Sequence, residues 1–369
     1  MRILILSKRQ YTGKDLLDDR FGRLYEIPEN LAARGHEVRG LTLSYRRRGE
    51  GRRDSSAGVH WDSVDIGALL TGLPRYLELL GGTLRDFRPD VVWASSDVFH
   101  ALIAWKRCRA FAPVVIDLYD NYESFGGAML PGVRRLFGRA CREAAALTVV
   151  SGRLGEHVAR RYAADNPKLV LGNAVRKDVF RPRPKHEARA ALGLPVEARL
   201  VGTAGAITAQ RGIDTLFEAF LRLAERDPAL WLVHAGPADG TPARYPHPRI
   251  IDLGVLAHER VPELFSALDV AVVCNLDSSF GRFCFPQKFF EILACGTPVV
   301  AAAVGEVGDL LEAKADCRFP PGSAADLERC VRSQLDRPRP VTGLEVPDWS
   351  DRAAELERFL GRVVAAAAA

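Results

Sequence analysis

Short apolar runs alternate with amphipathic segments along the whole chain, and this alternation limits the possible folds more than any other feature. Runs such as Arg2–Ser7 and Val91–Ala94 have the near-continuous apolar character of strands buried in a parallel sheet. Between them lie residues with helical spacing, and Gly35 is placed to end the first helix. Pro28 predicts either a kink in that helix or a later start. The sequence therefore predicts strands layered with helices.

The alternation occurs twice, with a break near Phe180–Pro184. That stretch is polar and punctuated by prolines, which is typical of a domain boundary. A final helical stretch, Asp351–Val364, has one apolar stripe and must dock on one of the two halves. We therefore predict an α/β protein with two Rossmann-like, doubly wound domains that face each other across a cleft. The predicted domains are residues 1–178, completed by a C-terminal helix at 350–369, and residues 179–349.

The composition excludes several classes of protein. Apolar residues make up 47% and charged residues 26%, which is ordinary globular usage and argues against disorder, and no apolar run is long enough to span a membrane. The cysteines form no CxxC pair and have no histidine partner at zinc-finger spacing, so we expect free thiols in a reducing cytoplasm. We thus expect a soluble, cytoplasmic protein.

Positive charge gathers in two places despite a net charge of only +5. One cluster, at 46–48 and 52–53, flanks a glycine-containing stretch, and the other contains Arg134, Arg135 and Arg139 beside Leu136 and Phe137. The interpretation we favour is a solvated loop and a solvated helix face. The alternatives are phosphate-bearing ligands or weak peripheral contact with an anionic membrane. Nucleic acid is not an expected partner, because no aromatic residues interleave with these arginines.

Two strand-end segments contain residues suited to an anionic ligand. In open α/β sheets ligands bind beyond the carboxyl ends of the strands. The strand predicted at 200–204 leads into Gly205–Asp214, where glycine permits close backbone approach and Arg211 offers planar donors for phosphate. About 80 residues later, a helix expected to start near Pro286 places Lys288 and Glu291 on one face. Taken alone, these residues also fit a plain strand-to-helix turn and a surface Lys–Glu pair.

In this order, the two segments resemble the donor-binding half of the family-4 retaining glycosyltransferases of the GT-B fold. Gly205–Asp214 is similar to the family's segment with Lys-Gly-hydrophobic-Asp, with Arg211 in the place of the lysine. Pro286–Val300 matches its P-x-K-x-x-E-x-L-A-x-G-x-P-V-V segment nearly completely. Weaker matches follow in the expected order along nearly the whole chain, among them Gly35–Val38 and Gly172–Val175.

The resemblance implies a nucleoside-diphosphate sugar as donor, bound mainly by the second domain, and an acceptor hydroxyl that the sequence does not identify. It implies that Arg211 and Lys288 contact the diphosphate, that Glu291 accepts the ribose hydroxyls, and that Asp120 serves the sugar or acceptor from the first domain. It implies donor binding at the following residues: Gly13, Gly205, Arg211, Gly254, Val255, Leu256, Phe285, Pro286, Gln287, Lys288 and Glu291. We expect retention at the anomeric carbon by front-face transfer, with no cofactor and no metal, because Arg and Lys stabilise the leaving diphosphate.

The chain departs from the family's pattern at three positions. Ala206 stands where an arginine is usual, so a second phosphate cation would come from elsewhere, the candidates being Lys8, Arg9, Lys14 and Arg282. Phe283 replaces a glutamate that many members have eight residues before the ribose-binding one, which puts the sugar of the donor in doubt. Tyr119 replaces the histidine of a common His-Asp pair, whose aspartate is Asp120. Strand-end capping is the alternative role for Asp120 and for its neighbour Asp117.

Three alternative functions remain at this stage. An epimerase or a phosphorylase of the same fold would use a similar site, and a nucleotide-sugar-binding protein without transfer activity would fit the departures at Ala206 and Phe283. An oxidoreductase fits poorly, because the first strand is followed by Ser7-Lys8-Arg9 and not by a GxGxxG fingerprint.

Overall fold

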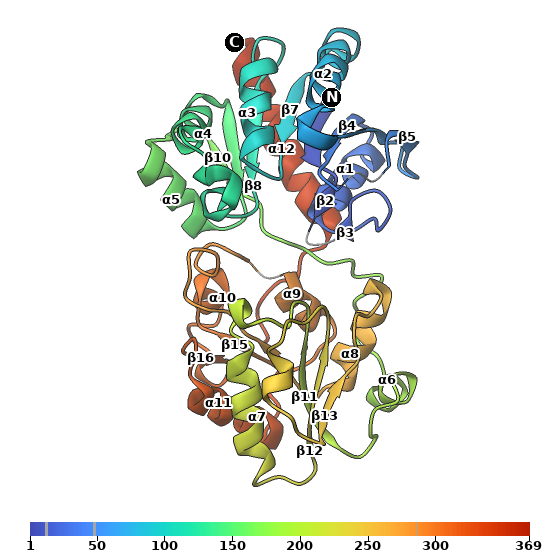
Figure 1. Ribbon diagram of the computed structural model, residues 1–369, viewed down its shortest axis with the longest axis vertical. Helices are drawn as coiled ribbons and strands as arrows, with labels where there is room; N and C mark the ends of the chain where they lie inside the picture. Colours follow the sequence, from blue (N-terminus) through green and yellow to red (C-terminus); the bar gives the residue numbers. More distant parts are fainter. Residues whose placement is uncertain (12–13, 47–48, 286) are drawn as a thin grey trace. The chain divides into compact units, whose positions relative to one another are not determined.

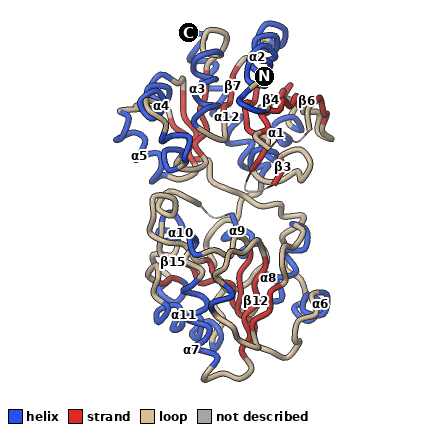
Figure 2. The backbone as a smooth tube through the Cα atoms, viewed as in Figure 1, coloured by secondary structure: helices blue, strands red, loops and turns tan. Residues whose placement is uncertain are grey.

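The structure, a computed structural model, describes residues 1–11, 14–46, 49–285 and 287–369. The chain divides into two compact units (Figure 1), each built around its own sheet. Unit 1 comprises Met1–Asn173 and Trp349–Ala369, and unit 2 comprises Ala174–Asp348. Figure 2 shows that in each unit the strands are flanked by helices, so the prediction of two doubly wound α/β domains is confirmed.

The division between the units lies between Asn173 and Ala174, whereas the sequence analysis placed it after residue 178. The chain past this point already belongs to unit 2, because Val175 forms a parallel bridge with Asp348. The proline-rich stretch that suggested the boundary also belongs to unit 2, where the buried Phe180 lies against His258 at a centroid distance of 5.1 Å.

Unit 1 has an eight-stranded sheet in which all strands are parallel except the edge strand β5. Across the sheet the order is β10 (Lys168–Val170), β9 (Ala146–Val149), β8 (Val114–Leu118), β7 (Val91–Ala94), β1 (Arg2–Lys8), β4 (Glu37–Ser44), β6 (His60–Asp65) and β5 (Gly51–Asp54). A short hairpin, β2 (Gln10–Tyr11) and β3 (Lys14–Asp15), follows β1. The helices are α1 (Arg23–Ala33), α2 (Leu73–Phe87), α3 (Val98–Arg107), α4 (Val133–Glu143), α5 (Gly152–Tyr162) and α12 (Trp349–Ala368).

Several local predictions for unit 1 can be compared with these elements. Helix α1 begins before Pro28 and continues through it, so Pro28 does not mark a late start. Gly35 follows α1 with a φ of 88°, as expected for a residue that ends a helix. The arginines at 52–53 are solvated as expected, but they lie in the exposed strand β5 and not in a loop, and their side chains pair with Asp62 and Asp18.

Unit 2 has a six-stranded sheet, parallel throughout. Its order is β13 (Ile250–Asp252), β12 (Leu230–Ala235), β11 (Arg199–Ala204), β14 (Val270–Val273), β15 (Val299–Ala302) and β16 (Arg318–Phe319). The helices are α6 (Lys185–Ala191), α7 (Asp214–Ala224), α8 (Val261–Ala267), α9 (Gln287–Ala294), α10 (Gly305–Leu310) and α11 (Ala324–Asp336). Because β11 and β14 are neighbours in a parallel sheet, the segments that follow them emerge side by side at its carboxyl edge.

Candidate functional site

A tight turn places Arg211 at the carboxyl edge of the unit 2 sheet. Residues Ala209–Arg211 form one turn of 3-10 helix, which ends at Gly212 in the left-handed conformation with a φ of 70°. A Cβ atom at Gly212 would lie 2.8 Å from Cδ2 of Leu276, a residue of the segment that follows β14. Glycine is therefore needed there both for the backbone conformation and for the contact between the two segments.

The side chain of Lys288 reaches the same segment from α9. Its ammonium nitrogen lies 3.2 Å from the position that a Cβ atom would take at Gly205, so the ammonium lies beside the Gly205 backbone. Burial lowers the pKa of Lys288 below its ordinary value, and the positive charge of Arg211 lowers it further. Two cations are thus held close together although they repel each other.

Neither cation forms an ion pair with a carboxylate among the residues that the structure describes, although the charge of Glu291 partly offsets the lowering of the Lys288 pKa. No carboxylate oxygen there lies within 4.0 Å of the Arg211 guanidinium or of the Lys288 ammonium. Most other arginines of unit 2 that contact a side chain contact an acidic one, as Arg244 contacts Asp214 and Arg282 contacts Asp277. Arg282, one of the alternative phosphate cations, therefore has a partner of its own. Two neighbouring cations without an ion-pair partner, one in a strand-end loop and one in the helix beside it, are the arrangement expected of an anion-binding site.

The remaining donor residues of the prediction lie along the same edge of unit 2. Glu291 is one turn along α9, only 6% exposed, and its Oε1 accepts a hydrogen bond of 2.9 Å from Nε2 of Gln287. Gly254 follows β13, and its carbonyl accepts a hydrogen bond of 2.7 Å from the Gly236 amide. That glycine in turn lies directly against the Gly205 carbonyl.

Other side chains of this set differ in how much of their surface is accessible. Val255 is 73% exposed and Leu256 is half-buried. The ring of Phe285 is buried and stacks on Phe290 at 4.7 Å between centroids. The predictions for Gly13 and Pro286 lie outside the described residues.

In unit 1, Asp120 lies beyond the carboxyl end of β8, and its Oδ1 accepts a hydrogen bond of 2.8 Å from the Asn121 amide. Lys8, at the end of β1, has a pKa lowered by burial, an effect that the charges of Asp97 and Asp120 partly offset. The structure therefore brings Lys8 near both carboxylates, which the sequence analysis did not foresee. Asp97 also caps α3 by accepting hydrogen bonds from the amides of Phe99 and His100.

The neighbouring Asp117 has a structural role. It is fully buried, and its carboxylate accepts hydrogen bonds from Arg23 at 2.9 Å, Ser95 at 2.6 Å and Thr148 at 2.7 Å. These contacts join β8 to α1, β7 and β9, which satisfies a buried carboxylate on several sides. Asp117 therefore stabilises the sheet and is not accessible to a substrate.

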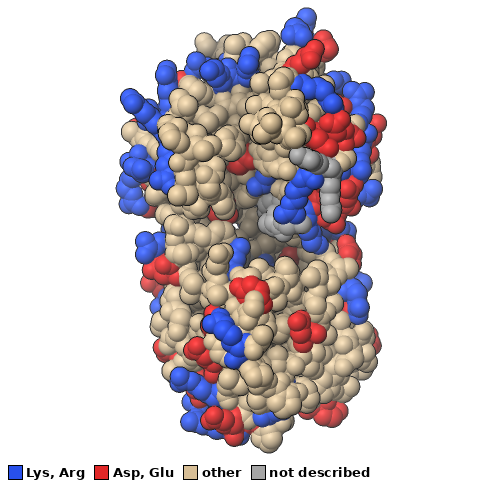
Figure 3. Space-filling view, viewed as in Figure 1, with Lys and Arg blue, Asp and Glu red and all other residues tan. Residues whose placement is uncertain are grey.

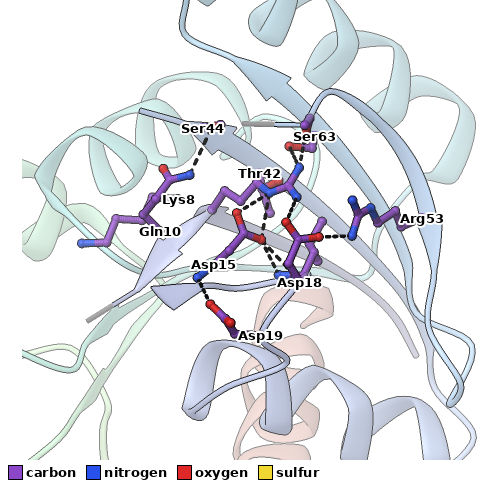
Figure 4. A network of polar contacts seen from close by, with 12 residues as sticks. Lys8, Gln10, Asp15, Asp18, Asp19, Thr42, Ser44, Arg53 and Ser63 are labelled. Atoms are coloured by element: carbon purple, nitrogen blue, oxygen red, sulfur yellow. Dashed lines mark hydrogen bonds and ion pairs between the residues drawn. The ribbon is translucent and has the colours of Figure 1, made fainter. Parts of the chain in front are cut away.

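Arg9, another candidate phosphate cation, is also occupied within unit 1. It is 1% exposed, and its guanidinium donates to Asp15 at 2.8 Å, Asp18 at 3.1 Å and Ser63 at 3.3 Å, and to the carbonyl of Gly49. Figure 4 shows the side chains of Asp15, Asp18 and Ser63 gathered beside the hairpin that follows β1. The suggestion that Arg9 might replace the missing phosphate cation is therefore wrong, because its donors are already used.

Two family models match the chain: "Glycosyl transferase 4-like domain" at residues 23–174 and "Glycosyl transferases group 1" at residues 198–337. Together they cover most of both units. The chain belongs to the group 1 glycosyltransferases of the GT-B fold, as the resemblance of the motifs implied.

Individual relatives agree with this family. The chain is 33% identical over 225 residues to D-inositol 3-phosphate glycosyltransferase of Mycobacterium tuberculosis, a match over 56% of this chain and 41% of that protein, so it spans less than half the length of that relative. Its fold is similar to that of sucrose-phosphate synthase of Thermosynechococcus elongatus (TM-score 0.82, 19% identity, 99% of both chains). It is also similar to that of Anabaena HepE in complex with UDP (TM-score 0.69, 18% identity, 100% of this chain and 98% of that one).

Proposed function

We propose that the chain is a glycosyltransferase that moves a sugar from a nucleoside-diphosphate sugar to an acceptor hydroxyl. The observation that carries the proposal is the pair of cations, Arg211 and Lys288, which lack a carboxylate partner among the described residues and lie beside the Gly205 backbone. A diphosphate would supply the missing negative charge. Glu291, one turn along the same helix, would accept hydrogen bonds from a ribose diol.

The finer features of the reaction are part of the same proposal. The motifs resemble those of retaining enzymes, which supports transfer with retention at the anomeric carbon. Arg211 and Lys288 would stabilise the charge that develops on the departing diphosphate, so the reaction would require neither a metal nor a separate cofactor. We further propose a cytoplasmic reaction, since no disulfide joins any of the cysteines that the structure describes, as suits a reducing compartment.

A thermal-shift screen tests the donor half of the proposal. A ligand that binds only the folded state stabilises it by about 2.7 kcal/mol at a hundredfold excess over its Kd. UDP, GDP and their sugars should therefore raise the Tm, whereas uridine and guanosine should raise it much less. If no diphosphate shifts the Tm more than its nucleoside does, the proposed function is wrong.

An assay of nucleotide release from the stabilising donor separates transfer from the alternatives. The names of two relatives include a polyol or sugar phosphate, inositol 3-phosphate and sucrose-phosphate, so phosphorylated polyols and sugars are the first acceptors to try. A transferase releases nucleotide faster when the acceptor is present. Release that is independent of any acceptor would favour an epimerase, and binding without release would favour a silent binding protein.

We also propose weak contact of unit 1 with an anionic membrane surface. Figure 3 shows Lys and Arg side chains gathered on the side of unit 1 where α4 and α5 lie. On α4, Arg135 and Leu136 are exposed, whereas Phe137 is buried and cannot insert into a bilayer. No helix among the described residues has the length and apolar character to cross a bilayer.

Each well-placed cation contributes about 1 kcal/mol near such a surface. Sedimentation with phosphatidylserine vesicles at low salt should therefore bind part of the protein and release it as salt is added. Reversal of charge by Arg135→Glu should weaken this binding, whereas Arg226→Glu in unit 2 serves as the control. No binding at low salt would contradict the membrane proposal alone.

A further inference from the structure

Arg211 is held in place by an aromatic ring. Its guanidinium carbon lies 3.9 Å from the centroid of the Phe280 ring. The other cation–aromatic contacts among the described residues range from 4.8 to 5.9 Å, so this pair is the tightest of them. Phe280 is half-buried and belongs to the segment that links β14 to α9, and the sequence motifs gave this residue no role.

The segment that carries Phe280 is braced by its own backbone. The Phe280 carbonyl accepts hydrogen bonds from the amides of Phe283, at 3.2 Å, and Cys284, at 2.9 Å. The Gly281 amide donates to Oγ of Ser278 at 3.0 Å, and a Cβ atom at Gly281 would lie 2.0 Å from the Leu276 carbonyl oxygen. The ring is therefore presented to Arg211 from a compact turn.

A ring positions an arginine differently from a carboxylate. Elsewhere in unit 2, acidic side chains hold arginines through their N–H donors, as Asp269 holds Arg189 at 2.8 Å and Asp227 holds Arg199 at 2.8 Å. A carboxylate on Arg211 would cancel its charge and compete with a phosphate for the same donors. An aromatic ring contacts only the face of the guanidinium, so the N–H groups at its edge and the full positive charge stay available.

We propose that Phe280 is a positioning residue, which fixes the Arg211 guanidinium edge toward the diphosphate of the donor while leaving its charge uncompensated. This inference rests on the proposed function, since it assigns Phe280 a role in the same site. It predicts that loss of the Phe280 ring lowers the affinity for a nucleoside diphosphate but not the affinity for the nucleoside.

The test compares binding of UDP with uridine, and of GDP with guanosine, by calorimetry in the full chain. Phe280→Leu should weaken diphosphate binding about fivefold and leave nucleoside binding within about twofold. Phe280→Tyr keeps an aromatic face and should stay within about twofold of the unmodified protein for both ligands. Phe280→Glu places a carboxylate beside Arg211 and should abolish the preference for the diphosphate as fully as Arg211→Ala does. Phe111→Leu, an exposed residue that precedes β8 in unit 1, is the matched control.

The outcomes separate this inference from the proposed function. The inference is overturned if Arg211→Ala selectively lowers the affinity for the diphosphates but Phe280→Leu does not. It is also overturned if Phe280→Tyr lowers the diphosphate affinity as much as Phe280→Leu does. The contact between the ring and Arg211 would then be ordinary packing. If Phe280→Leu does not fold, the Tyr and Glu variants decide the question. If the unmodified protein shows no preference for either diphosphate, the proposed function fails, and this inference with it.

Discussion

The two buried arginines of unit 1 and the two cations of the candidate site in unit 2 are held in opposite ways. In unit 1, Arg9 and Arg23 are at most 1% exposed, and acidic side chains bind both: Asp15 lies 2.8 Å from Arg9 and Asp117 lies 2.9 Å from Arg23. In unit 2, Arg211 and Lys288 have no such partner among the described residues. A cation beside these sheets can thus be an internal brace, as in unit 1, or stay without an ion-pair partner, as in unit 2.

The two kinds of cation differ in whether the protein itself supplies the opposite charge. Taking a charge out of water is costly, and a folded protein normally offsets the cost with an opposite charge of its own. Where it does not, the folded state carries a cost that a ligand can relieve. The four predictions that follow test this contrast, from the largest expected effect to the smallest.

The braces of unit 1 should act on stability. Asp117→Ala removes the partner of the buried Arg23, and breaking a buried ion pair in this way costs about 3–5 kcal/mol. Urea denaturation should show this loss. Asp336→Ala, which breaks an exposed pair with Arg199, should cost about 1 kcal/mol or less. Equal losses for the two variants would show that the buried pair is no brace.

Glu291 should act on the donor. Glu291→Ala removes a hydrogen-bond acceptor for the ribose, which is worth about 1.5–3 kcal/mol, so donor affinity and activity should fall at least tenfold. The fold should persist, as circular dichroism and Tm can show. Glu225→Ala, at an exposed position after α7, is the control. Unchanged donor affinity in the Glu291 variant would remove this residue from the site.

Lys288 should oppose stability when no ligand is bound. Its pKa is lowered by burial and by the charge of Arg211, so folding favours its neutral form. The unfolded chain then holds more protons than the folded one between the two pKa values, and stability rises with pH across that interval. Lys288→Met should increase the free energy of unfolding at neutral pH by roughly 1 kcal/mol, and so raise the Tm. It should also weaken diphosphate binding. It should also abolish this rise with pH. A lower Tm in the variant would contradict the account.

Asp120 should have the smallest effect on nucleotide affinity, because it belongs to unit 1 and lies near Lys8. Asp120→Asn should change the Kd for a nucleoside diphosphate by less than about threefold, or ~0.7 kcal/mol, while turnover falls strongly. Full turnover would leave Asp120 with a capping role only. A large loss of nucleotide affinity would instead place it against the diphosphate.

Strands with a continuous apolar run could be predicted from the sequence. Two neighbouring strands without such a run could not. The predictions of strands at 2–7 and 91–94 are confirmed, because a strand buried on both faces has a continuous apolar run in its sequence. The strands β4 and β6 were missed. Gly40 of β4 is opposite Trp61 of β6, and the tryptophan ring occupies the space that a side chain at Gly40 would fill. The Trp61 ring thus fills the space of a side chain at Gly40, and the glycine interrupts the apolar pattern of β4.

The sequence could name the residues of the candidate site, but it could not show which partners the charged side chains have. Spacing in the motifs located Arg211, Lys288 and Glu291, since these are fixed by short local segments. The sequence could not show that Arg9 is bound by acidic residues of the hairpin after β1, or that Phe280 lies on Arg211. Both facts depend on contacts between separate segments, which a single chain does not reveal through spacing.

The most direct test of the central claim is a titration of UDP and uridine into the unmodified protein and into Arg211→Ala. The account predicts that the variant binds UDP at least about tenfold more weakly, the effect of losing one charge-assisted hydrogen bond to phosphate. Uridine affinity should change by less than about twofold, because Arg211 acts on phosphate charge alone. Equal losses for both ligands, or no loss of UDP affinity, would contradict the claim that the uncompensated cations of unit 2 form a diphosphate site.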